Sequence, residues 1–169
     1  MILILGTNGL STRVIYNRLS RSGVDLGVVL ERPVERSVLV KGRIKRLGIR
    51  KVLGQLFFQV FFMPLLKLLA RHRREQLLTG SQLADDDIPD NKVHRVSSAN
   101  SLEAQDLLQK LNPQIVIVSG TRILSKALLS KISCPIINMH AGITPKYRGV
   151  HGAYWAFAQG LPDLAGVTV

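Results

Sequence analysis

The chain opens with Met-Ile-Leu-Ile-Leu-Gly-Thr-Asn-Gly, residues 1–9, and this stretch decides the fold. Residues 1–5 form an uninterrupted apolar run, which is typical of a strand that is buried on both faces of a sheet. Gly6 and Gly9 then supply a turn directly after the strand. A buried first strand followed by a glycine turn predicts an α/β protein whose sheet starts with the opening residues.

A helix is predicted directly after this turn. Val14 and Leu19 belong to a segment whose apolar groups recur at helical spacing. Ser11 or Thr12 can cap the start of the helix, and Gly23 can end it. The helix would form the first crossover of a parallel sheet.

Three further apolar runs predict strands, at residues 26–30, 115–119 and 136–139, and residues 93–96 predict a weaker strand. A helix is expected over residues 102–111, because Asn100 and Glu103 resemble a capping box and Pro113 terminates the helical pattern. Strands that alternate with helices predict a mostly parallel, Rossmann-like sheet with helices on both faces. The expected fold class is therefore α/β.

Length and composition bound the class of protein. A chain of 169 residues fits a single domain, since domains usually have about 100–200 residues. Cys134 is the only cysteine, so an intrachain disulfide is excluded and a reducing compartment is expected. The opening residues have no basic leader and read as a strand, which favours a cytoplasmic protein over a secreted one.

Residues 41–79 interrupt the alternation as a basic helical insertion. The formal net charge is +12, and ten of the 23 lysines and arginines lie between Lys41 and Arg74. These cations flank an apolar stretch, residues 52–66, that contains two glutamines and Pro64, which should kink or break the helix. A membrane span needs about 20 apolar residues, so spanning is not expected.

Three roles stay open for this insertion. Its apolar face can pack on its own domain or on a second subunit, it can lie on an anionic membrane surface, or its charge can attract nucleic acid such as tRNA. Packing is preferred, peripheral membrane contact comes second, and nucleic-acid binding is the least favoured.

The turn after the first strand is the first candidate binding site. Gly6, Thr7, Asn8 and Gly9 lie where free backbone amides and the positive end of a helix dipole can hold a phosphate. Glu31, at the end of the second strand, imitates the acid of a dinucleotide-binding fingerprint. The pattern is G-x-x-G and not the full fingerprint, and a structural turn explains the glycines equally well. A nicotinamide-dependent oxidoreductase is one alternative function, and a noncatalytic basic module that binds a membrane surface or RNA is another.

The second candidate site follows the last predicted strand. Asn138 and His140 are two residues apart, so their side chains project to the same side of the backbone. Ligands bind at the carboxyl ends of strands in open α/β sheets. An amide can meet negative charge that develops on oxygen, and an imidazole can move a proton near neutral pH. The pair suits acyl transfer, although a strand-end histidine alone is more often structural.

The ordered motifs around this pair resemble the formyltransferase family. The family signature has an Asn-x-His pair, a Pro-x-Tyr-Arg-Gly loop, a Trp-Ala helix and a Gly-Val-Thr strand, here Asn138 and His140, residues 145–149, 155–156 and 166–168. Residues 119–124 are similar to the family's folate-binding strand end, and residues 1–9 to its opening strand and loop. Residues 41–78 look like an insertion relative to the family core.

The resemblance implies transfer of a formyl group from 10-formyltetrahydrofolate, the cosubstrate, to a primary amine. Asn138 would bind the oxyanion, and His140 would stabilise it and assist the proton transfers. Arg122, Ile123 and Leu124 would line the folate pocket, although Arg122 can equally be a surface charge. A small-molecule acceptor, such as glycinamide ribonucleotide or a nucleotide-linked amino sugar, is favoured over an aminoacyl-tRNA.

One part of the family pattern is missing from these residues. The family uses an aspartate downstream of the Gly-Val-Thr strand to orient the histidine, and this position would lie beyond Val169. Asp163 precedes that strand and does not match. The resemblance therefore implies a formyltransferase domain, residues 1–169, that is incomplete at its carboxyl end, and an inactive or nearly inactive chain that belongs to an active protein.

Other side chains are expected to have structural roles. Trp155 is expected to anchor the core, and Tyr147 and Arg148 to brace their loop. His72 and His94 lack metal-ligand spacing with the cysteine or with a carboxylate cluster, so no metal site is expected.

Overall fold

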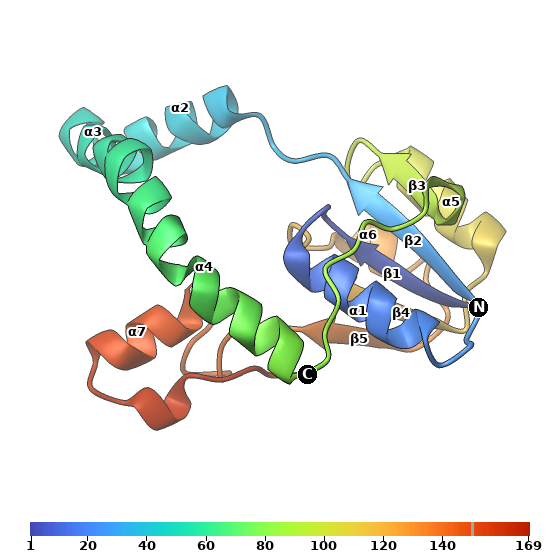
Figure 1. Ribbon diagram of the computed structural model, residues 1–169. Coiled ribbons are helices and arrows are strands. Elements are labelled where there is room, and N and C mark those ends of the chain that lie inside the picture. The colour runs from blue at the N-terminus through green and yellow to red at the C-terminus, as the bar shows by residue number, and fades with distance from the viewer. Residues whose placement is uncertain (150) are drawn as a thin grey trace. The chain divides into compact units, whose positions relative to one another are not determined.

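The computed structural model describes residues 1–149 and 151–169 and divides the chain into two compact units. The first, here called the sheet unit, consists of Met1–Arg32 and Asp85–Val169. The second, here called the helical unit, is Pro33–Ala84. Figure 1 shows that strands gather in the sheet unit and that the helical unit contains helices alone.

The sheet unit has a five-stranded, fully parallel sheet in the order β3-β2-β1-β4-β5. Its strands are β1 (Ile2–Gly6), β2 (Leu26–Glu31), β3 (Val93–Val96), β4 (Ile115–Ser119) and β5 (Ile136–Met139). The three later strands have the predicted bounds, β2 ends one residue later than predicted, and β1 both begins and ends one residue later. The observed sheet confirms the α/β fold class.

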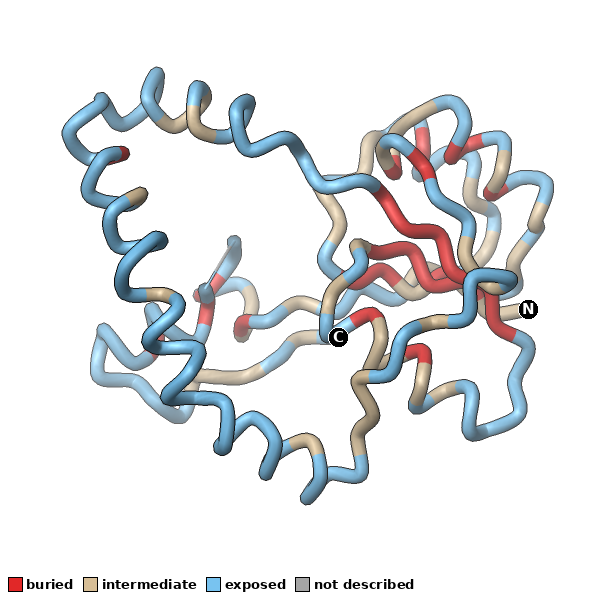
Figure 2. The backbone as a smooth tube through the Cα atoms, turned by 45° about the horizontal axis from the view of Figure 1, so that its top comes forward, coloured by how far each residue is buried: buried red, intermediate tan, exposed pale blue. Residues whose placement is uncertain are grey.

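Helices cover both faces of the sheet, as Figure 1 shows. On one face, Ile4, Val28 and Leu30 pack with Tyr16 of α1 (Leu10–Ser20). On the other face, the buried cluster includes residues of β1, β2 and β4 together with α5 (Leu102–Leu111) and α6 (Lys126–Leu129). β1 and β2 are buried along almost their whole length, and Figure 2 marks buried residues in red. Both faces of these strands are covered, which explains why their apolar runs are continuous.

The start of α1 differs from the prediction. Gly9 is the N-cap, and neither Ser11 nor Thr12 caps the helix, because both lie within its first turn. Thr12 is instead fully buried beside Gly6, where a Cβ would lie 2.7 Å from Thr12 Oγ1 and 2.8 Å from the Ser119 carbonyl oxygen. Gly6 therefore permits a close approach of β1, α1 and β4 that no larger residue allows.

The start of α5 also differs from the prediction. Its N-cap is Ser101, whose hydroxyl accepts a hydrogen bond from the Ala104 amide, and not Asn100. The Asn100 side chain is used elsewhere, because it hydrogen-bonds to the loop after β4. The predicted capping box was therefore wrong by one residue, while the bounds of the helix were right.

The carboxyl-terminal part of the sheet unit contains α7 (Gly152–Ala158), a 3₁₀ turn η3 (Pro162–Leu164) and a short bridge between Thr168 and His140. Trp155 is 52% exposed, so the expectation of a core anchor was wrong. The buried face of α7 consists of Gly152 and Ala156. Gly152 lies so close to the preceding loop that a Cβ there would be 2.7 Å from Gly142 Cα, which leaves room only for glycine.

The helical unit consists of α2 (Arg36–Leu47), α3 (Ile49–Phe57), a π-helical turn η1 (Phe58–Phe62) and α4 (Met63–Gly80). Pro64 does not end the helix. In the π-turn the Met63 amide donates to the Phe58 carbonyl, five residues back, and not to the carbonyl four residues back as in an α-helix. The regular α-helical hydrogen bonding is therefore already interrupted next to Pro64, whose nitrogen cannot donate.

The helix Ile49–Gly80 is long and apolar enough to cross a membrane, judged by length and composition alone. Its most apolar part has a mean hydropathy of 1.7 and is 6% buried. The helix is thus longer than the uncharged stretch 52–66 on which the expectation against spanning was based, and that expectation stays a prediction. After this unit, Asp85 pairs with Arg13 of α1 at 2.7 Å and is half-buried.

Candidate active site at the carboxyl ends of β1, β4 and β5

The parallel register brings three predicted site segments to one edge of the sheet. Gly6 is paired with Ser119, and Ser119 is paired with Met139, so β1, β4 and β5 end in one row. The turn that follows β1, the loop that follows β4 and the Asn138 to His140 segment therefore start side by side. The chain order reverses between β1 and β4, and ligands bind at such switch points in open α/β sheets.

Asn138 and His140 occupy the end of β5. Asn138 is in register with Val118, is exposed, and has no hydrogen-bond partner for its amide among the residues that the structure describes. The Nε2 atom of His140 lies 3.0 Å from the Tyr147 carbonyl oxygen. A carbonyl oxygen only accepts, so Nε2 carries the hydrogen and donates, which leaves Nδ1 as the nitrogen that can exchange a proton with a ligand.

The loop after His140 is held by Thr168. The backbones of His140 and Thr168 exchange two hydrogen bonds, of 2.8 and 2.9 Å. The Thr168 hydroxyl donates to the Gly142 carbonyl at 2.8 Å and accepts from the Thr144 amide at 3.0 Å. The Gly-Val-Thr segment is thus joined to the loop that carries the histidine, which explains why the two motifs occur together.

Tyr147 braces the same loop, as predicted. Its ring is buried, and its hydroxyl donates to Gln159 Oε1 at 2.9 Å. A Cβ on Gly142 would lie 2.5 Å from the Tyr147 carbonyl oxygen, the same atom that accepts from His140. Only glycine at position 142 permits this arrangement. Within residues 1–149 and 151–169, no carboxylate hydrogen-bonds to His140.

The loop after β4 is fixed by a buried ion pair that the sequence did not reveal. Glu31 is 3% exposed and accepts from Arg122 Nε at 2.7 Å, from the Arg122 amide at 2.8 Å and from the Ala99 amide at 2.9 Å. Arg122 is therefore a bracing residue, and the expectation of a plain surface charge was wrong. The only available signal was an acidic residue at the end of the apolar run 26–30.

This ion pair also bears on the alternative oxidoreductase hypothesis. Both carboxylate oxygens of Glu31 are already occupied by donors within the protein. A ribose hydroxyl could bind Glu31 only if these bonds broke and the buried carboxylate lost its arginine partner. Glu31, the acid that imitated a dinucleotide fingerprint, is therefore a structural residue at the carboxyl end of β2.

Asn100 fixes the loop from its other side. Its amide nitrogen donates to the Ile123 carbonyl at 2.9 Å, and its oxygen accepts from the Ser125 amide at 2.8 Å. Between these anchors the Ile123 side chain is 94% exposed, while Leu124 packs against the buried cluster. The loop therefore exposes the Ile123 side chain to solvent, while hydrogen bonds to Asn100 hold the loop backbone in place.

The turn between β1 and α1 keeps only part of its backbone amides available, because the Gly9 amide donates to the Thr7 carbonyl at 2.8 Å. Gly9 provides no side-chain cap, so the first amides of α1 have no such partner, as at the anion sites of other helices. The Thr7 hydroxyl donates to the Gly120 carbonyl at 3.3 Å, and Asn8 Oδ1 accepts from Arg13 at 3.4 Å. Arg13, which is beside the turn, pairs with Asp85 at 2.7 Å, and this hydrogen bond raises the pKa of its guanidinium.

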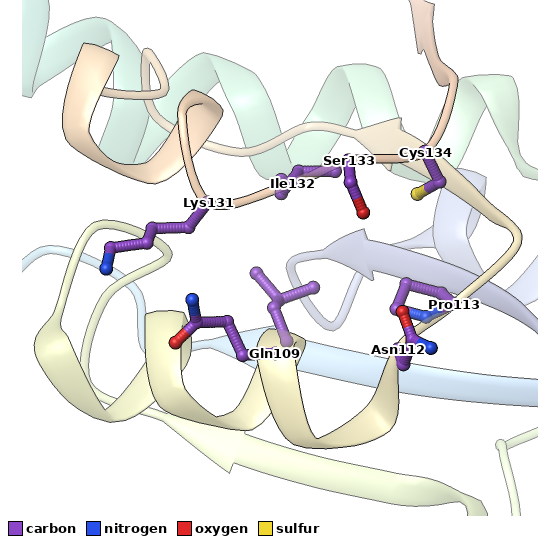
Figure 3. A pocket seen from close by; sticks show the side chains of 8 residues that line it. Gln109, Asn112, Pro113, Lys131, Ile132, Ser133 and Cys134 are labelled. Carbon is purple, nitrogen blue, oxygen red and sulfur yellow. The ribbon is translucent and has the colours of Figure 1, made fainter.

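A pocket of about 260 Å³ lies at the opposite edge of the sheet. It is formed where the chain enters β4 and β5, and Figure 3 shows its lining residues Leu108, Gln109, Asn112, Pro113, Lys131, Ile132, Ser133 and Cys134. It has no part in the site described above. In the described part of the chain, no three histidine, cysteine or acidic side chains gather to hold a metal ion.

Comparison with known proteins decides the family. Residues 69–169 match the family described as formyl transferase, which is more than half of the chain. The chain belongs to the formyl transferase family. The matched range contains the formyltransferase motifs of β5 and its loop, the Asn100 brace and the loop after β4.

Known formyltransferases align with parts of the chain. The methionyl-tRNA formyltransferase of Finegoldia magna is 40% identical over 71 residues, which are 41% of this chain and 23% of that protein. The methionyl-tRNA formyltransferase of Chlorobium chlorochromatii is 32% identical over 76 residues, which are 45% of this chain and 24% of that protein. The aligned segments thus span less than a quarter of these relatives.

A solved formyltransferase structure shares the fold. Glycinamide ribonucleotide transformylase 1 from Symbiobacterium toebii superimposes with a TM-score of 0.50 at 14% sequence identity. The match covers 94% of this chain and 59% of that one. The likeness supports the fold of the family member described here.

Proposed function

We propose that the protein transfers a formyl group from 10-formyltetrahydrofolate to a primary amine at the carboxyl ends of β4 and β5. The observation that carries this proposal is the placement of Asn138 and His140. An exposed amide without a partner in the described chain stands two residues from an imidazole, beside a loop that presents Ile123. Family membership supports the transfer chemistry.

In the proposed reaction the amine nitrogen attacks the formyl carbon, and the carbonyl oxygen becomes an oxyanion. The Asn138 amide donates hydrogen bonds to this oxyanion. His140 accepts the proton that the amine nitrogen loses, through Nδ1 in the arrangement described here. The tetrahedral intermediate then collapses, the bond to the folate nitrogen breaks, and that nitrogen takes up a proton.

We place the folate beside residues 120–124. Ile123 offers apolar area to a flat ring system, and backbone groups of the tied loop offer hydrogen bonds. Leu124 packs against the core and supports the loop from beneath, and Arg122 fixes its start. In this proposal only Ile123 contacts the ligand with its side chain, while Arg122 and Leu124 position it.

We favour a small-molecule amine whose phosphate binds at the turn of Gly6, Thr7, Asn8 and Gly9. The uncapped start of α1 and the charge of Arg13 support an anion there. Methionyl-tRNA is the second candidate acceptor, because the curated relatives carry that name. Formylation assays with glycinamide ribonucleotide, a nucleotide-linked amino sugar and methionyl-tRNA would separate the acceptors.

A binding experiment tests the proposed site. Titration of the protein with a non-hydrolysable 10-formyltetrahydrofolate analogue should give saturable binding, and titration with a nicotinamide dinucleotide should not. The reverse outcome would favour the oxidoreductase alternative. Formyl transfer is then measured with the whole protein, because the chain spans less than a quarter of the curated relatives it matches.

A further inference from the structure

The helical unit carries a long run of exposed apolar side chains. Along the helix Ile49–Gly80, the exposed large apolar residues are Ile49, Leu53, Phe57, Phe58, Val60, Phe61, Phe62, Leu65, Leu66, Leu68, Leu69 and Leu77. Val52 is the buried residue that α3 contributes. A soluble helix normally buries its apolar face, so a helix that leaves it open calls for a partner.

Four phenylalanines concentrate this apolar area around the π-turn. The rings of Phe57 and Phe61 lie 4.7 Å apart between centroids, and those of Phe58 and Phe62 lie 5.6 Å apart. Phe57 and Phe62 approach to 6.0 Å, which joins the pairs into one cluster. All four rings are exposed. We call Phe57, Phe58, Phe61 and Phe62 the phenylalanine cluster.

The charge of the helical unit complements an anionic surface. Residues 33–84 contain eleven lysines and arginines and two acidic residues, so this unit carries +9 of the chain's +12. The cations lie on both sides of the apolar stretch, as far as Lys51 before it and from Lys67 after it. Apolar aromatic side chains between basic segments are the composition of helices that bind at the membrane interface.

We propose that the helical unit binds the protein to an anionic lipid bilayer, with the phenylalanine cluster inserted at the level of the headgroups. The fifteen residues between Lys51 and Lys67 span about 22 Å as a helix, which is less than the hydrocarbon core of about 30 Å. Cations at both ends are drawn to the same anionic leaflet. The helix therefore lies in the interface and does not cross the bilayer.

Two other partners fit the unit less well. Nucleic acid would bind the cations through its phosphates, but it would leave the phenylalanine cluster and the leucines after it exposed. A second copy of the chain would cover the apolar residues but would bring two strongly positive units together, at an electrostatic cost. A bilayer with anionic lipid satisfies the charge and the apolar area at once.

Vesicle flotation of the full chain tests the proposal. The chain should float with vesicles of phosphatidylcholine and phosphatidylglycerol and stay in the dense fraction with phosphatidylcholine alone. Phe57→Ser with Phe61→Ser should lower the partition coefficient about tenfold or more, because two aromatic side chains no longer leave water. Lys45→Glu with Arg46→Glu should produce a similar loss, because the charge of the unit falls.

Matched controls lie in the sheet unit. Leu102→Ser removes an exposed leucine from α5, and Lys110→Glu with Lys126→Glu reverses two exposed cations. These variants should float like the unchanged chain. Circular dichroism should show that every variant keeps its helices, so that a lost fold is not mistaken for lost binding.

Several outcomes would overturn the proposal. No flotation with anionic vesicles would do so, as would flotation that the two serine substitutions leave unchanged. Resistance of the bound chain to extraction with alkaline carbonate would show a crossing helix in place of an interfacial one. A lipid-free dimer that the phenylalanine substitutions dissociate, without vesicle binding, would assign the surface to a second copy. Binding of tRNA without lipid binding would assign it to nucleic acid.

Discussion

Arg122 Nε donates to Glu31 Oε2 at 2.7 Å, and this bond ties the end of β4 to the end of β2 across the strand between them. That strand is β1, whose following turn is the proposed phosphate site. The ion pair therefore anchors the loop after β4, one loop of the candidate active site, to the end of β2. Its carboxylate is almost completely buried, so it also has a large effect on stability.

Arg122→Ala should lower the free energy of unfolding by about 2–3 kcal/mol, because it leaves the Glu31 carboxylate buried without its charged partner. Urea unfolding followed by circular dichroism measures this change. Arg148→Ala removes an exposed arginine from the loop after β5 and should change the free energy by less than about 0.5 kcal/mol. Equal effects of the two substitutions would contradict the bracing role.

Asn138→Ala should reduce kcat of the whole protein about 100- to 1000-fold, because it removes the donor proposed for the oxyanion. The side chain is exposed and has no partner in the described chain, so unfolding in urea should be unchanged. Steady-state formyl transfer and urea unfolding are measured on the same preparation. Turnover within a factor of two or so of the unchanged protein would exclude the proposed role.

Ile123→Ser should weaken binding of the folate analogue about tenfold or more, since a side chain that is 94% exposed in the free protein would be covered by the ligand. Stability should not fall, because the side chain packs against nothing in the sheet unit. Calorimetric titration gives the dissociation constant. Leu102→Ser, which changes another exposed residue, is the control, and a parallel loss of affinity there would point to an indirect effect.

Gly142→Ala should destabilise the protein by about 2–3 kcal/mol, because the added methyl would lie 2.5 Å from the Tyr147 carbonyl oxygen. The same substitution at Gly54, within α3 and with open space around it, should stabilise by up to about 1 kcal/mol through helix propensity. Thermal unfolding distinguishes the two signs. A neutral Gly142→Ala would show that the loop after β5 can open without loss.

The fold could be predicted from the sequence because strands buried on both faces have continuous apolar runs. For this reason β1, β2 and β4 were predicted to within one residue, whereas β3 and β5 are edge strands that stay largely exposed. The errors concern features that depend on contacts between distant segments. Thr12 cannot cap α1 because it is buried beside Gly6, and Trp155 stays exposed because Gly152 and Ala156 occupy the contact face of α7.

The candidate site could be predicted only in part. The two-residue spacing of Asn138 and His140 predicted that both lie at one strand end, and the register confirms that placement. The Glu31 to Arg122 brace could not be predicted, because it requires that β1 lie between β2 and β4 in the sheet. The spacing of residues along a chain does not predict the order in which the strands lie in the sheet.

The backbone contact between Gly142 and Gly152 limits how the protein can be redesigned. Any larger residue at either position would push α7 away from the histidine loop. Libraries that aim to change acceptor preference should therefore keep these two glycines fixed. The randomised positions belong on the exposed side of the helix, at Tyr154 and Phe157, where new shapes and charges can be tried without moving the proposed catalytic groups.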